Sequence, residues 1–420
     1  MKRLRIAVVS NHYPPHYIGG YELGCRDVVN GLQARGHEVK VLTSTYNVDG
    51  PEDDGEVYRW LVSLPPWEPV SSGGFFRLLR REIINRRSLT RLCRTFSPDL
   101  IYVWNPAGIS LSFVFSSQPT NVPVCYFVSD HWLSEWESDF GYGMWSYRHP
   151  RRARRAVWKT LLPLLDASKV LRRPRPPDFR RVHFASRFLK DAALAKGKPV
   201  ACAKVIHWGV NVELAPYQTE SQNPLRLLYV GQVAPHKGVH TAIEALRRLV
   251  REHGYEAATL TIAGGSVNPD YEQQVRRLVS SSGLERSVRF TGQLPREQLL
   301  SLYRHHAILV FPSVWNEPFS ITVLEAMSSG LAVVGTPTGG SLEILRDGEN
   351  ALVFPKEDSR QCAAQILRLW TEPGLLEKIR VEARLTIESE FRFEQMVDSI
   401  EQSLQEVAAG AGWCECLGVV

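Results

Sequence analysis

Two glutamates, Glu317 and Glu325, lie eight positions apart in the stretch FPSVWNEPFSITVLEAMSSGLAVVGTPTGGSLE at residues 311–343. The apolar run at residues 308–311 predicts a buried strand, and the Asn-Glu-Pro sequence at 316–318 predicts a loop after it. Residues 319–329 have the apolar spacing of a helix, and residues 331–335 predict the next strand of a parallel sheet. Glu317 is therefore expected in the loop at the carboxyl end of a strand, and Glu325 about two turns into the helix.

Four residues open this predicted helix: Phe319, Ser320, Ile321 and Thr322. The first N–H groups of a helix lack acceptors within the helix, so they favour an anion at that end. An anion-binding helix start between two carboxylates suits a nucleotide-sugar, because the amides can hold a diphosphate and the carboxylates can accept hydrogen bonds from hydroxyls. The alternative is a capped surface helix with a solvated glutamate.

The same stretch resembles the donor-binding motif of the family 4 glycosyltransferases. The resemblance rests on the spacing from Glu317 to Glu325, on the Ala-Met and Gly that follow, and on Gly339, Gly340 and Glu343 after the next strand. It implies an α/β chain with the GT-B fold, which consists of two Rossmann-like doubly wound parallel-sheet domains facing a central cleft. It also implies that Glu317 faces the transferred sugar and that Glu325 holds the donor ribose.

The first residues of the chain predict a Rossmann-like domain. Residues 4–10 and 39–43 have the composition of buried strands, and residues 21–35 have helical spacing between them. Gly19 and Gly20 open that helix, and no Gly-x-Gly-x-x-Gly sequence is present, so a dinucleotide site is not supported. The stretch from Gly19 resembles the opening of family 4 glycosyltransferases, which implies that the glycine pair approaches the donor pyrophosphate.

A second strand–loop–helix unit carries Gln232 and Lys237. Residues 227–231 predict a strand and residues 239–251 a helix, which places Lys237 near a helix start where it can contact phosphate. The family commonly has arginine at the place of Gln232, with the arginine and the lysine both on the diphosphate. Gln232 carries no charge, so one charge-assisted hydrogen bond, of order 1.5–3 kcal/mol, is absent or comes from another residue.

Asp130 and His131 follow the strand predicted at residues 122–128. Family members often have His-Asp here, with the histidine near the reacting sugar; this chain has Ser129 at the aligned place of the histidine. Asp130 matches the family pattern, and His131 either substitutes for the missing histidine or packs in the domain. The tryptophans that follow, at positions 132, 136 and 145, either stack on a sugar acceptor or belong to a packed insertion.

The positive charge is unevenly spread along the chain. The net charge is +6, yet residues 148–181 hold twelve Lys or Arg and two Asp, a local net charge of +10. Residues 75–96 are also basic and have helical spacing, with an apolar face of Phe76, Leu79 and Ile83 and a basic face of Arg77, Arg80, Arg81 and Arg87. These segments form solvated faces, or they contact an anionic membrane or an anionic acceptor through a mobile basic loop. Nucleic acid is not an expected partner, because no aromatic platform or nucleic-acid-binding motif accompanies the charge.

The 420 residues are expected to form two domains. We predict an acceptor-side domain at residues 1–214 with a basic insertion at about 135–181, a linker at 215–224, and a donor-binding domain at 225–387. A helix at 388–409 is expected to return to the first domain, as it does in the family, and residues 410–420 are expected to be a tail.

Other features of the sequence limit the possible location and chemistry of the protein. No apolar run reaches the ~18 residues of a membrane span, and the first residues are too short for a signal peptide, so a cytoplasmic location is predicted. The seven cysteines are scattered, and most are expected to be reduced core residues. No cofactor is expected, and the absence of an Asp-x-Asp sequence argues against a metal-dependent GT-A enzyme.

The resemblance therefore implies a retaining, metal-independent hexosyltransferase-type enzyme that uses a nucleotide-diphosphate sugar as donor substrate. Its acceptor is predicted to be a glycan or a lipid-linked glycan in bacterial-type polysaccharide or glycolipid synthesis, with the enzyme peripheral at the inner membrane face. Two alternatives keep the same donor site. One is a nucleotide-sugar epimerase of GT-B shape, and the other is a non-catalytic homologue, which Gln232 and Ser129 would favour.

Overall fold

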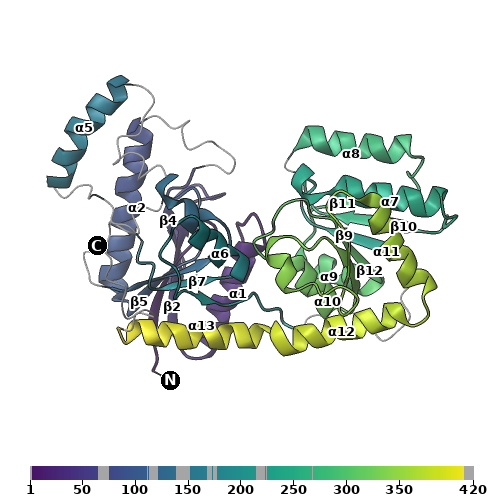
Figure 1. Ribbon diagram of the computed structural model, residues 1–420. Helices are drawn as coiled ribbons and strands as arrows, with labels where there is room; N and C mark the ends of the chain where they lie inside the picture. The colour runs from purple at the N-terminus through teal and green to yellow at the C-terminus, as the bar shows by residue number, and fades with distance from the viewer. Residues whose placement is uncertain are drawn as a thin grey trace. The chain divides into compact units, whose positions relative to one another are not determined.

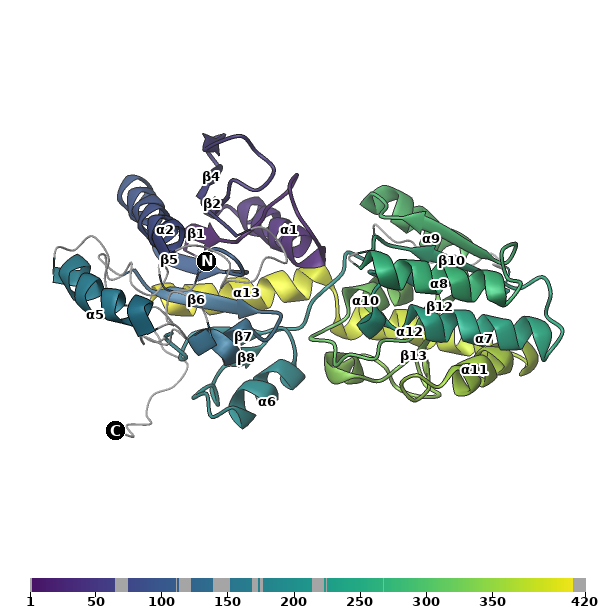
Figure 2. The same cartoon turned by 90° about the horizontal axis from the view of Figure 1, so that it is seen from above.

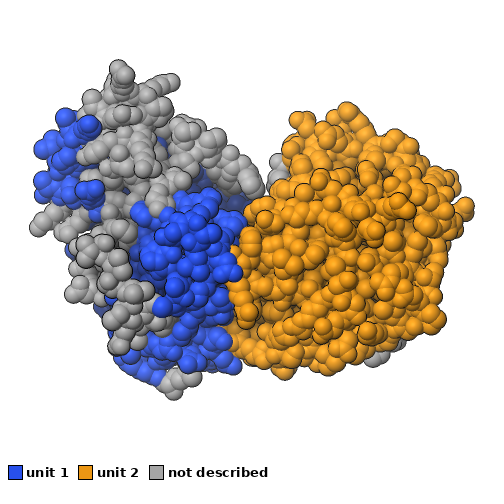
Figure 3. All heavy atoms as spheres, in the orientation of Figure 1, with its two compact units in different colours: residues 1–185, 189–206, 397–420 blue, residues 186–188, 207–396 orange. Residues whose placement is uncertain are grey.

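The computed structural model describes residues 2–64, 75–110, 112, 122–138, 152–167, 173, 177–213, 223, 225–266 and 268–410. The chain divides into two compact units, coloured in Figure 3. Unit 1 comprises Met1–Ala185, Leu189–Ile206 and Val397–Val420, and unit 2 comprises Ser186–Phe188 and His207–Met396. The predicted linker at 215–224, except residue 223, lies outside the described residues, as do most of the predicted tail and large parts of the basic insertion.

Unit 1 is built on an eight-stranded sheet of order β3-β4-β2-β1-β5-β6-β7-β8. All neighbouring strands are parallel except β3 and β4, and β1 lies in the middle with β2 and β5 beside it. The elements are β1 (Arg5–Val9), α1 (Gly20–Ala34), β2 (Glu38–Ser44), β3 (Glu52–Asp53), β4 (Val57–Leu61), α2 (Phe75–Phe96), β5 (Leu100–Val103), β6 (Val124–Val128), η2 (Trp132–Ser138), α5 (Arg152–Ala167), β7 (Val182–Phe184), α6 (Arg187–Ala195) and β8 (Lys204–Val205).

Unit 2 is built on a six-stranded, fully parallel sheet of order β11-β10-β9-β12-β13-β14. Helices α7 and α8 cover one face of this sheet, and α9, α10 and α12 cover the other (Figures 1 and 2). The elements are β9 (Arg226–Val230), η3 (Pro235–Lys237), α7 (Val239–Arg251), β10 (Thr259–Ala263), α8 (Pro269–Ser281), β11 (Val288–Gly292), α9 (Arg296–His305), β12 (Ile308–Phe311), α10 (Ile321–Ser328), β13 (Ala332–Gly335), η4 (Gly339–Glu343), β14 (Leu352–Val353), α11 (Ser359–Thr371) and α12 (Leu375–Glu390). Helix α13 (Phe393–Ala408) begins in unit 2 and belongs to unit 1 from Val397 onward.

The central strands of unit 2 are short runs of aliphatic residues, as expected for a parallel sheet covered on both faces. All residues of β12 and β13 are buried. Strands β9 and β12 are direct neighbours, with Leu227 opposite Ile308. Because parallel strands end at the same edge of a sheet, the loop after β9, which carries Lys237, and the loop after β12, which carries Glu317, meet at that edge.

Three predicted segments differ from the structure. The segment predicted as one helix at 388–409 contains the last three residues of α12 and all of α13, which are separated at Phe391 and Arg392. At this break Val210 N–H donates to Phe391 O at 2.9 Å and Phe393 N–H donates to Val210 O at 3.0 Å, so a long-range backbone pairing interrupts the helix. The helix predicted at 319–329 begins only at Ile321. Part of the predicted basic loop, Arg152–Ala167, is helix α5.

Helix α2 has the bounds that the sequence predicts but not the expected faces. Arg81, which we expected on a solvated basic face, is 3% exposed. Its guanidinium donates to Gly108 O at 3.3 Å and to Glu82 Oε1 at 3.3 Å. Phe76, which we expected on an apolar face, is 78% exposed beside the exposed Arg77 and Arg80. The first two turns of α2 therefore present an aromatic ring and two cations to solvent.

Two further expectations concern cysteines and membrane helices. The thiols of Cys25, Cys93, Cys125 and Cys362 are buried and free, as expected, whereas Cys202 is disulfide-bonded. In the part of the chain that the structure describes, no helix combines the length and the hydrophobicity that crossing a membrane requires.

Candidate donor and catalytic site

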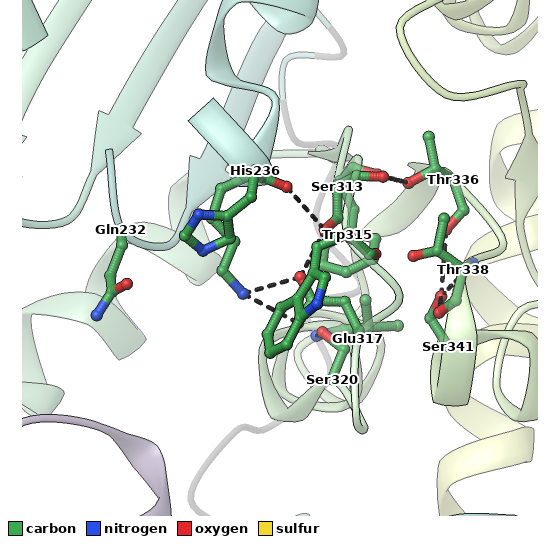
Figure 4. Close-up of polar contacts among 12 residues, drawn as sticks. Gln232, His236, Ser313, Trp315, Glu317, Ser320, Thr336, Thr338 and Ser341 are labelled. Carbon is green, nitrogen blue, oxygen red and sulfur yellow. Dashed lines mark hydrogen bonds and ion pairs between the residues drawn. The ribbon is translucent and has the colours of Figure 1, made fainter. Parts of the chain in front are cut away.

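Glu317 lies in the loop between β12 and α10 and is 5% exposed. Lys237 Nζ, from the end of η3, donates to both carboxylate oxygens, at 2.8 Å to Oε1 and 2.9 Å to Oε2. Ser313 Oγ donates to Oε1 at 2.6 Å, and Thr336 Oγ1 donates to Ser313 O at 2.7 Å. Figure 4 shows these contacts. The Glu317 carboxylate is therefore held from two sides, and Oε2 has the fewer protein donors.

Two glycines of η4 allow the Glu317 loop to pack closely on the next segment. Gly339 has φ +55°, and a Cβ there would overlap the backbone of Asn316 and Glu317. A Cβ on Gly340 would overlap the carbonyl of Pro318, and Gly340 N–H donates to Glu317 O at 2.6 Å. Any larger residue at either position would displace the loop that carries Glu317.

The start of α10 differs in detail from the expectation. Ser320 is the N-cap, with its Oγ accepting from Val323 N–H at 3.4 Å, and the helix begins at Ile321. Ile321 and Thr322 stand in the first helical turn, where N–H groups have no intrahelical acceptor. Phe319 lies outside the helix and is 7% exposed, with its ring stacked on His207 at 5.3 Å.

Contacts of His207 fix the residues that precede α10. His207 Nε2 lies 2.8 Å from Glu343 Oε2, and the two oxygens of Glu343 also accept from the N–H groups of Arg187 and Phe188 at 2.9 Å. Glu343, which the sequence singled out only as part of a motif, therefore joins the start of α6 to the histidine that stacks on Phe319. All these residues belong to unit 2.

Glu325, in the second turn of α10, has a separate set of partners. Tyr303 Oη donates to its Oε2 at 3.3 Å, and Arg296 Nη2 lies 3.6 Å from Oε1. Burial, followed by the charge of Glu325, raises the pKa of the Tyr303 hydroxyl well above its usual range, so this hydroxyl remains a donor. The two glutamates of the motif thus have no polar partner in common among these contacts.

Gln232 lies apart from the Lys237–Glu317 pair. Its backbone carbonyl accepts from Tyr229 Oη at 2.8 Å, and in Figure 4 its side-chain amide points away from Glu317, beyond His236. The Trp315 ring is 41% exposed and packs edge-on against the His236 ring at 5.7 Å, with Lys237 Nζ 5.4 Å from a ring centre of Trp315. An aromatic residue therefore borders the ion pair on its exposed side.

In unit 1, Gly19 precedes α1 and Gly20 is its first residue. Gly19 N–H donates to Glu22 Oε2 at 3.0 Å, so this amide is already used within the chain, whereas Gly20 is exposed. Asn105 Nδ2 lies 3.4 Å from Glu22 Oε1, and burial raises the pKa of this carboxyl. The structure thus adds Glu22 and Asn105 to the residues around the glycine pair.

Asp130 and His131 follow β6 and belong to unit 1, whereas Glu317 and Lys237 belong to unit 2. Asp130 Oδ1 accepts from Trp132 N–H at 2.8 Å. Burial raises the pKa of Asp130 to about 6; the Trp132 N–H opposes this rise, and the charges of Glu22 and Glu135 add to it. Burial and the charge of Lys196 lower the pKa of His131, so the imidazole is neutral near pH 7.

The raised pKa of Asp130 predicts a pH-dependent stability. A carboxyl whose pKa rises on folding stabilises the fold below its unfolded pKa of about 4, and this contribution is lost as the pH rises through about 6. The free energy of unfolding of the wild type should therefore fall relative to that of Asp130→Asn by roughly 2 kcal/mol between about pH 4.5 and about pH 7.5. Chemical denaturation at both pH values measures this; parallel profiles of the two proteins would contradict it.

The tryptophans after His131 pack against unit 1. Trp132 contacts Tyr126 edge-on at 6.1 Å, and Lys198 Nζ lies 5.6 Å from a ring centre of Trp136. Both indoles are partly buried, which favours a packed insertion over an open stacking platform for these two residues. Trp145 lies outside the described residues.

Sequence reasoning missed several residues that hold the proposed donor groups, namely Ser313, Tyr303, Arg296, Trp315 and Thr336. The positions of Ser313 and Trp315 could have been recognised from the sequence, since both residues follow the end of a buried strand just before Glu317. Among the described residues, no group of three or more His, Cys, Asp or Glu side chains is arranged to hold a metal ion.

Two family models match adjoining parts of the chain. The one described as Glycosyltransferase Family 4 matches residues 18–214, and the one described as Glycosyl transferases group 1 matches residues 213–386. An uncharacterized glycosyltransferase of Methanocaldococcus jannaschii is 25% identical over 408 residues, which are 94% of this chain and 96% of that protein.

Solved structures share the two-domain fold. Sucrose-phosphate synthase from Thermosynechococcus elongatus has a TM-score of 0.70 at 19% identity, with 97% of this chain and 100% of that chain covered. The Anabaena protein HepE in complex with UDP and glucose has a TM-score of 0.69 at 19% identity, with 96% and 100% covered.

Proposed function

The chain belongs to the family 4 glycosyltransferases and has the GT-B fold, and from this premise we propose that it transfers a sugar from a nucleotide-diphosphate donor to an acceptor hydroxyl with retention of configuration. The observation that carries the proposal is the Glu317 carboxylate, fixed by Lys237 and Ser313 next to the start of α10. Hydroxyl-binding, phosphate-binding and helix-terminal groups therefore meet at one edge of the unit 2 sheet.

Each group of unit 2 has a proposed role toward the donor. Glu317 Oε2 accepts hydrogen bonds from hydroxyls of the transferred sugar, and Glu325 accepts them from the ribose. The diphosphate is held by the remaining N–H of the Lys237 ammonium and by the amides of residues 319–322, with Gln232 as a further neutral donor. No metal ion or cofactor is part of this proposal, and the absence of an Asp-x-Asp sequence supports it.

The proposed reaction needs stabilisation of the leaving group more than a protein nucleophile. The bond between sugar C1 and the β-phosphate oxygen breaks, and its electron pair stays on that oxygen. The acceptor oxygen bonds to C1 from the same face, and its proton passes to the leaving diphosphate. We propose that Asp130 and His131, both of unit 1, act on the acceptor, with the neutral imidazole of His131 able to accept or donate a hydrogen bond.

A nucleotide-sugar screen tests the donor proposal. Ligands that bind the folded chain raise its melting temperature, by an amount that grows with ligand concentration over Kd. UDP-sugars come first, because HepE is complexed with UDP and glucose, and GDP-, ADP- and dTDP-sugars follow. The expected result is stabilisation by one nucleotide class that is smaller in Glu325→Gln at the same ligand concentration. A chain that no nucleotide-sugar stabilises would contradict the proposal.

We further propose that the acceptor is a glycan or a lipid-linked glycan of bacterial type, and that unit 1 approaches an anionic membrane at the cytoplasmic face. The support is the first two turns of α2, where the exposed ring of Phe76 stands beside two exposed arginines, Arg77 and Arg80. An aromatic ring next to cations is the combination that interfacial helices use. The larger basic cluster around residues 151–155 lies outside the residues whose side chains are described.

Vesicle binding tests this membrane contact. The wild type should bind anionic vesicles at low salt, release them at high salt, and ignore neutral vesicles, since each cation contributes about 1 kcal/mol near an anionic surface. The double variant Arg77→Ser/Arg80→Ser should bind about tenfold or more weakly. Arg91→Ser/Arg94→Ser, at the other end of the same helix, is the matched control. If the wild type does not bind anionic vesicles at low ionic strength, the proposed membrane contact is wrong.

A further inference from the structure

Lys237 and Glu317 form a closed ion pair where the proposed function places the diphosphate and the sugar. One nitrogen, Lys237 Nζ, lies 2.8 Å and 2.9 Å from the two carboxylate oxygens of Glu317. The hydrogen bond from Ser313 Oγ, at 2.6 Å, keeps the carboxylate in this position. An incoming diphosphate therefore meets an ammonium that is already neutralised.

The other side chains of the two loops that carry Lys237 and Glu317 do not restore the positive charge. Gln232 is neutral, and burial and the charge of Lys237 lower the pKa of His236, so its imidazole is neutral at pH 7. Lys356, which lies outside these two loops, keeps its positive charge, and its Nζ donates to the neutral Asn316 Oδ1 at 2.9 Å. The side chains of the two loops that meet beside Glu317 thus carry no net charge toward the diphosphate.

We infer that Glu317 competes with the diphosphate for Lys237, and that this competition weakens the binding of the nucleoside diphosphate product and favours its release. The inference rests on the proposed function and deepens the role of the same site. A phosphate that contacts Lys237 Nζ lies within a few ångströms of the Glu317 carboxylate, because both carboxylate oxygens contact that nitrogen. Like charges at that separation repel strongly at a partly buried site, where salt screens them little.

Transfer itself increases the negative charge that faces Glu317. Cleavage of the C1–O bond leaves the electron pair on the β-phosphate oxygen, while the acceptor oxygen takes C1 and the acceptor proton leaves through the diphosphate to solvent. Since the second pKa of a terminal phosphate is about 6, the free nucleoside diphosphate carries about one more negative charge at pH 7 than the sugar diester did. The carboxylate that orients the sugar therefore repels the product more than the donor.

Titration calorimetry on the full chain compares the two glutamates of the motif. The probes are UDP, GDP, ADP and dTDP, and the nucleotide that the wild type binds most tightly is used with every variant. Glu317→Gln should bind it about tenfold more tightly, because a charge is removed while the side-chain size is kept. Glu325→Gln should bind it about tenfold more weakly, because the ribose loses a charged acceptor. The same substitution of glutamate by glutamine is thus expected to change nucleotide affinity in opposite directions at the two positions of the motif.

Two controls and one further readout accompany the titrations. Glu317→Ala is the second charge-removing variant, and Glu349→Gln, a 60% exposed carboxylate of unit 2, should leave the affinity unchanged. Raising the salt from about 50 mM to about 300 mM should weaken nucleotide binding more in Glu317→Gln than in the wild type, because the site then carries a net positive charge.

The outcomes separate this inference from the proposed function. Equal or weaker nucleotide binding in both Glu317 variants overturns the competition, whereas weaker binding in Glu325→Gln would still support a nucleotide site. If none of the four nucleotides binds the wild type or either Glu317 variant, the proposed donor site is wrong and the inference falls with it.

Discussion

Glu317→Gln is expected to lower the turnover number for sugar transfer by about 10²–10³-fold or more, the size seen when a fixed group that stabilises the transition state is removed. The carboxylate is held by Lys237 and Ser313, so its orientation toward the sugar does not have to be established during the reaction. Glutamine keeps the size but lacks the charge and one acceptor. Steady-state kinetics with an active donor–acceptor pair measures the effect.

The same variant should remain folded, which a melting curve checks. Glu349→Gln serves as the control, because that carboxylate is exposed and lies in the same unit. Since Glu317→Gln is also expected to bind the nucleoside diphosphate more tightly, its loss of turnover cannot be attributed to loss of nucleotide binding. Near-normal turnover in Glu317→Gln would show that this residue does not act on the sugar.

Lys237→Ala is expected to weaken donor binding by about 1.5–3 kcal/mol, which is about 10- to 150-fold in Kd. The substitution removes the charged donor of the diphosphate and leaves the 5% exposed Glu317 carboxylate without its ammonium partner. Calorimetry with the donor measures the loss. Lys378→Ala is the matched control, because Lys378 Nζ donates to Gly348 O at 3.1 Å in the same unit without a contact to the motif. Unchanged donor affinity in Lys237→Ala would place the diphosphate elsewhere.

A companion variant tests whether the site lacks a cation. Gln232→Arg restores the charge that the family commonly has at this position, so donor binding should tighten or remain unchanged. Tighter binding would indicate that the neutral Gln232 holds the diphosphate less tightly than a charged residue at this position. Weaker binding would show that the Gln232 amide makes a contact that a guanidinium cannot replace.

Much of the donor site could be predicted from the sequence because it is local. Glu317, Ser320 and Glu325 lie within one strand–loop–helix unit, where strand hydrophobicity, an N-cap residue and helical spacing determine each placement. The carboxyl end of β12 was predictable for the same reason. Even here the helix start was wrong by two residues, because the Phe319 ring packs on His207 and leaves the residue outside α10.

The partners of the two glutamates could not be predicted, because they come from distant parts of the chain. Lys237 precedes Glu317 by 80 positions and reaches it only because β9 and β12 are neighbours. Tyr303 and Arg296 come from α9, whose side chains point to Glu325 only after the sheet has formed. No local sequence pattern predicts such contacts, because they depend on the order of the strands in the sheet.

Two other errors have the same origin. The break between α12 and α13 depends on backbone hydrogen bonds to Val210, which lies more than 180 positions earlier. Arg81 was expected on a solvated face because arginines recur along α2, yet its guanidinium is buried against Gly108 O. Periodicity predicts which side of a helix is apolar, but it does not predict which charged side chain finds a buried acceptor.

The most direct measurement of the central claim is a nuclear magnetic resonance time course of the wild type with the stabilising nucleotide-sugar and a glycan acceptor. The proposed activity predicts that nucleoside diphosphate and a new glycoside form in equal amounts, and that the anomeric signal of the glycoside has the configuration of the donor. Formation of an epimerised nucleotide-sugar without a glycoside, or an unchanged donor, would contradict a transferase, and a glycoside of inverted configuration would contradict retention.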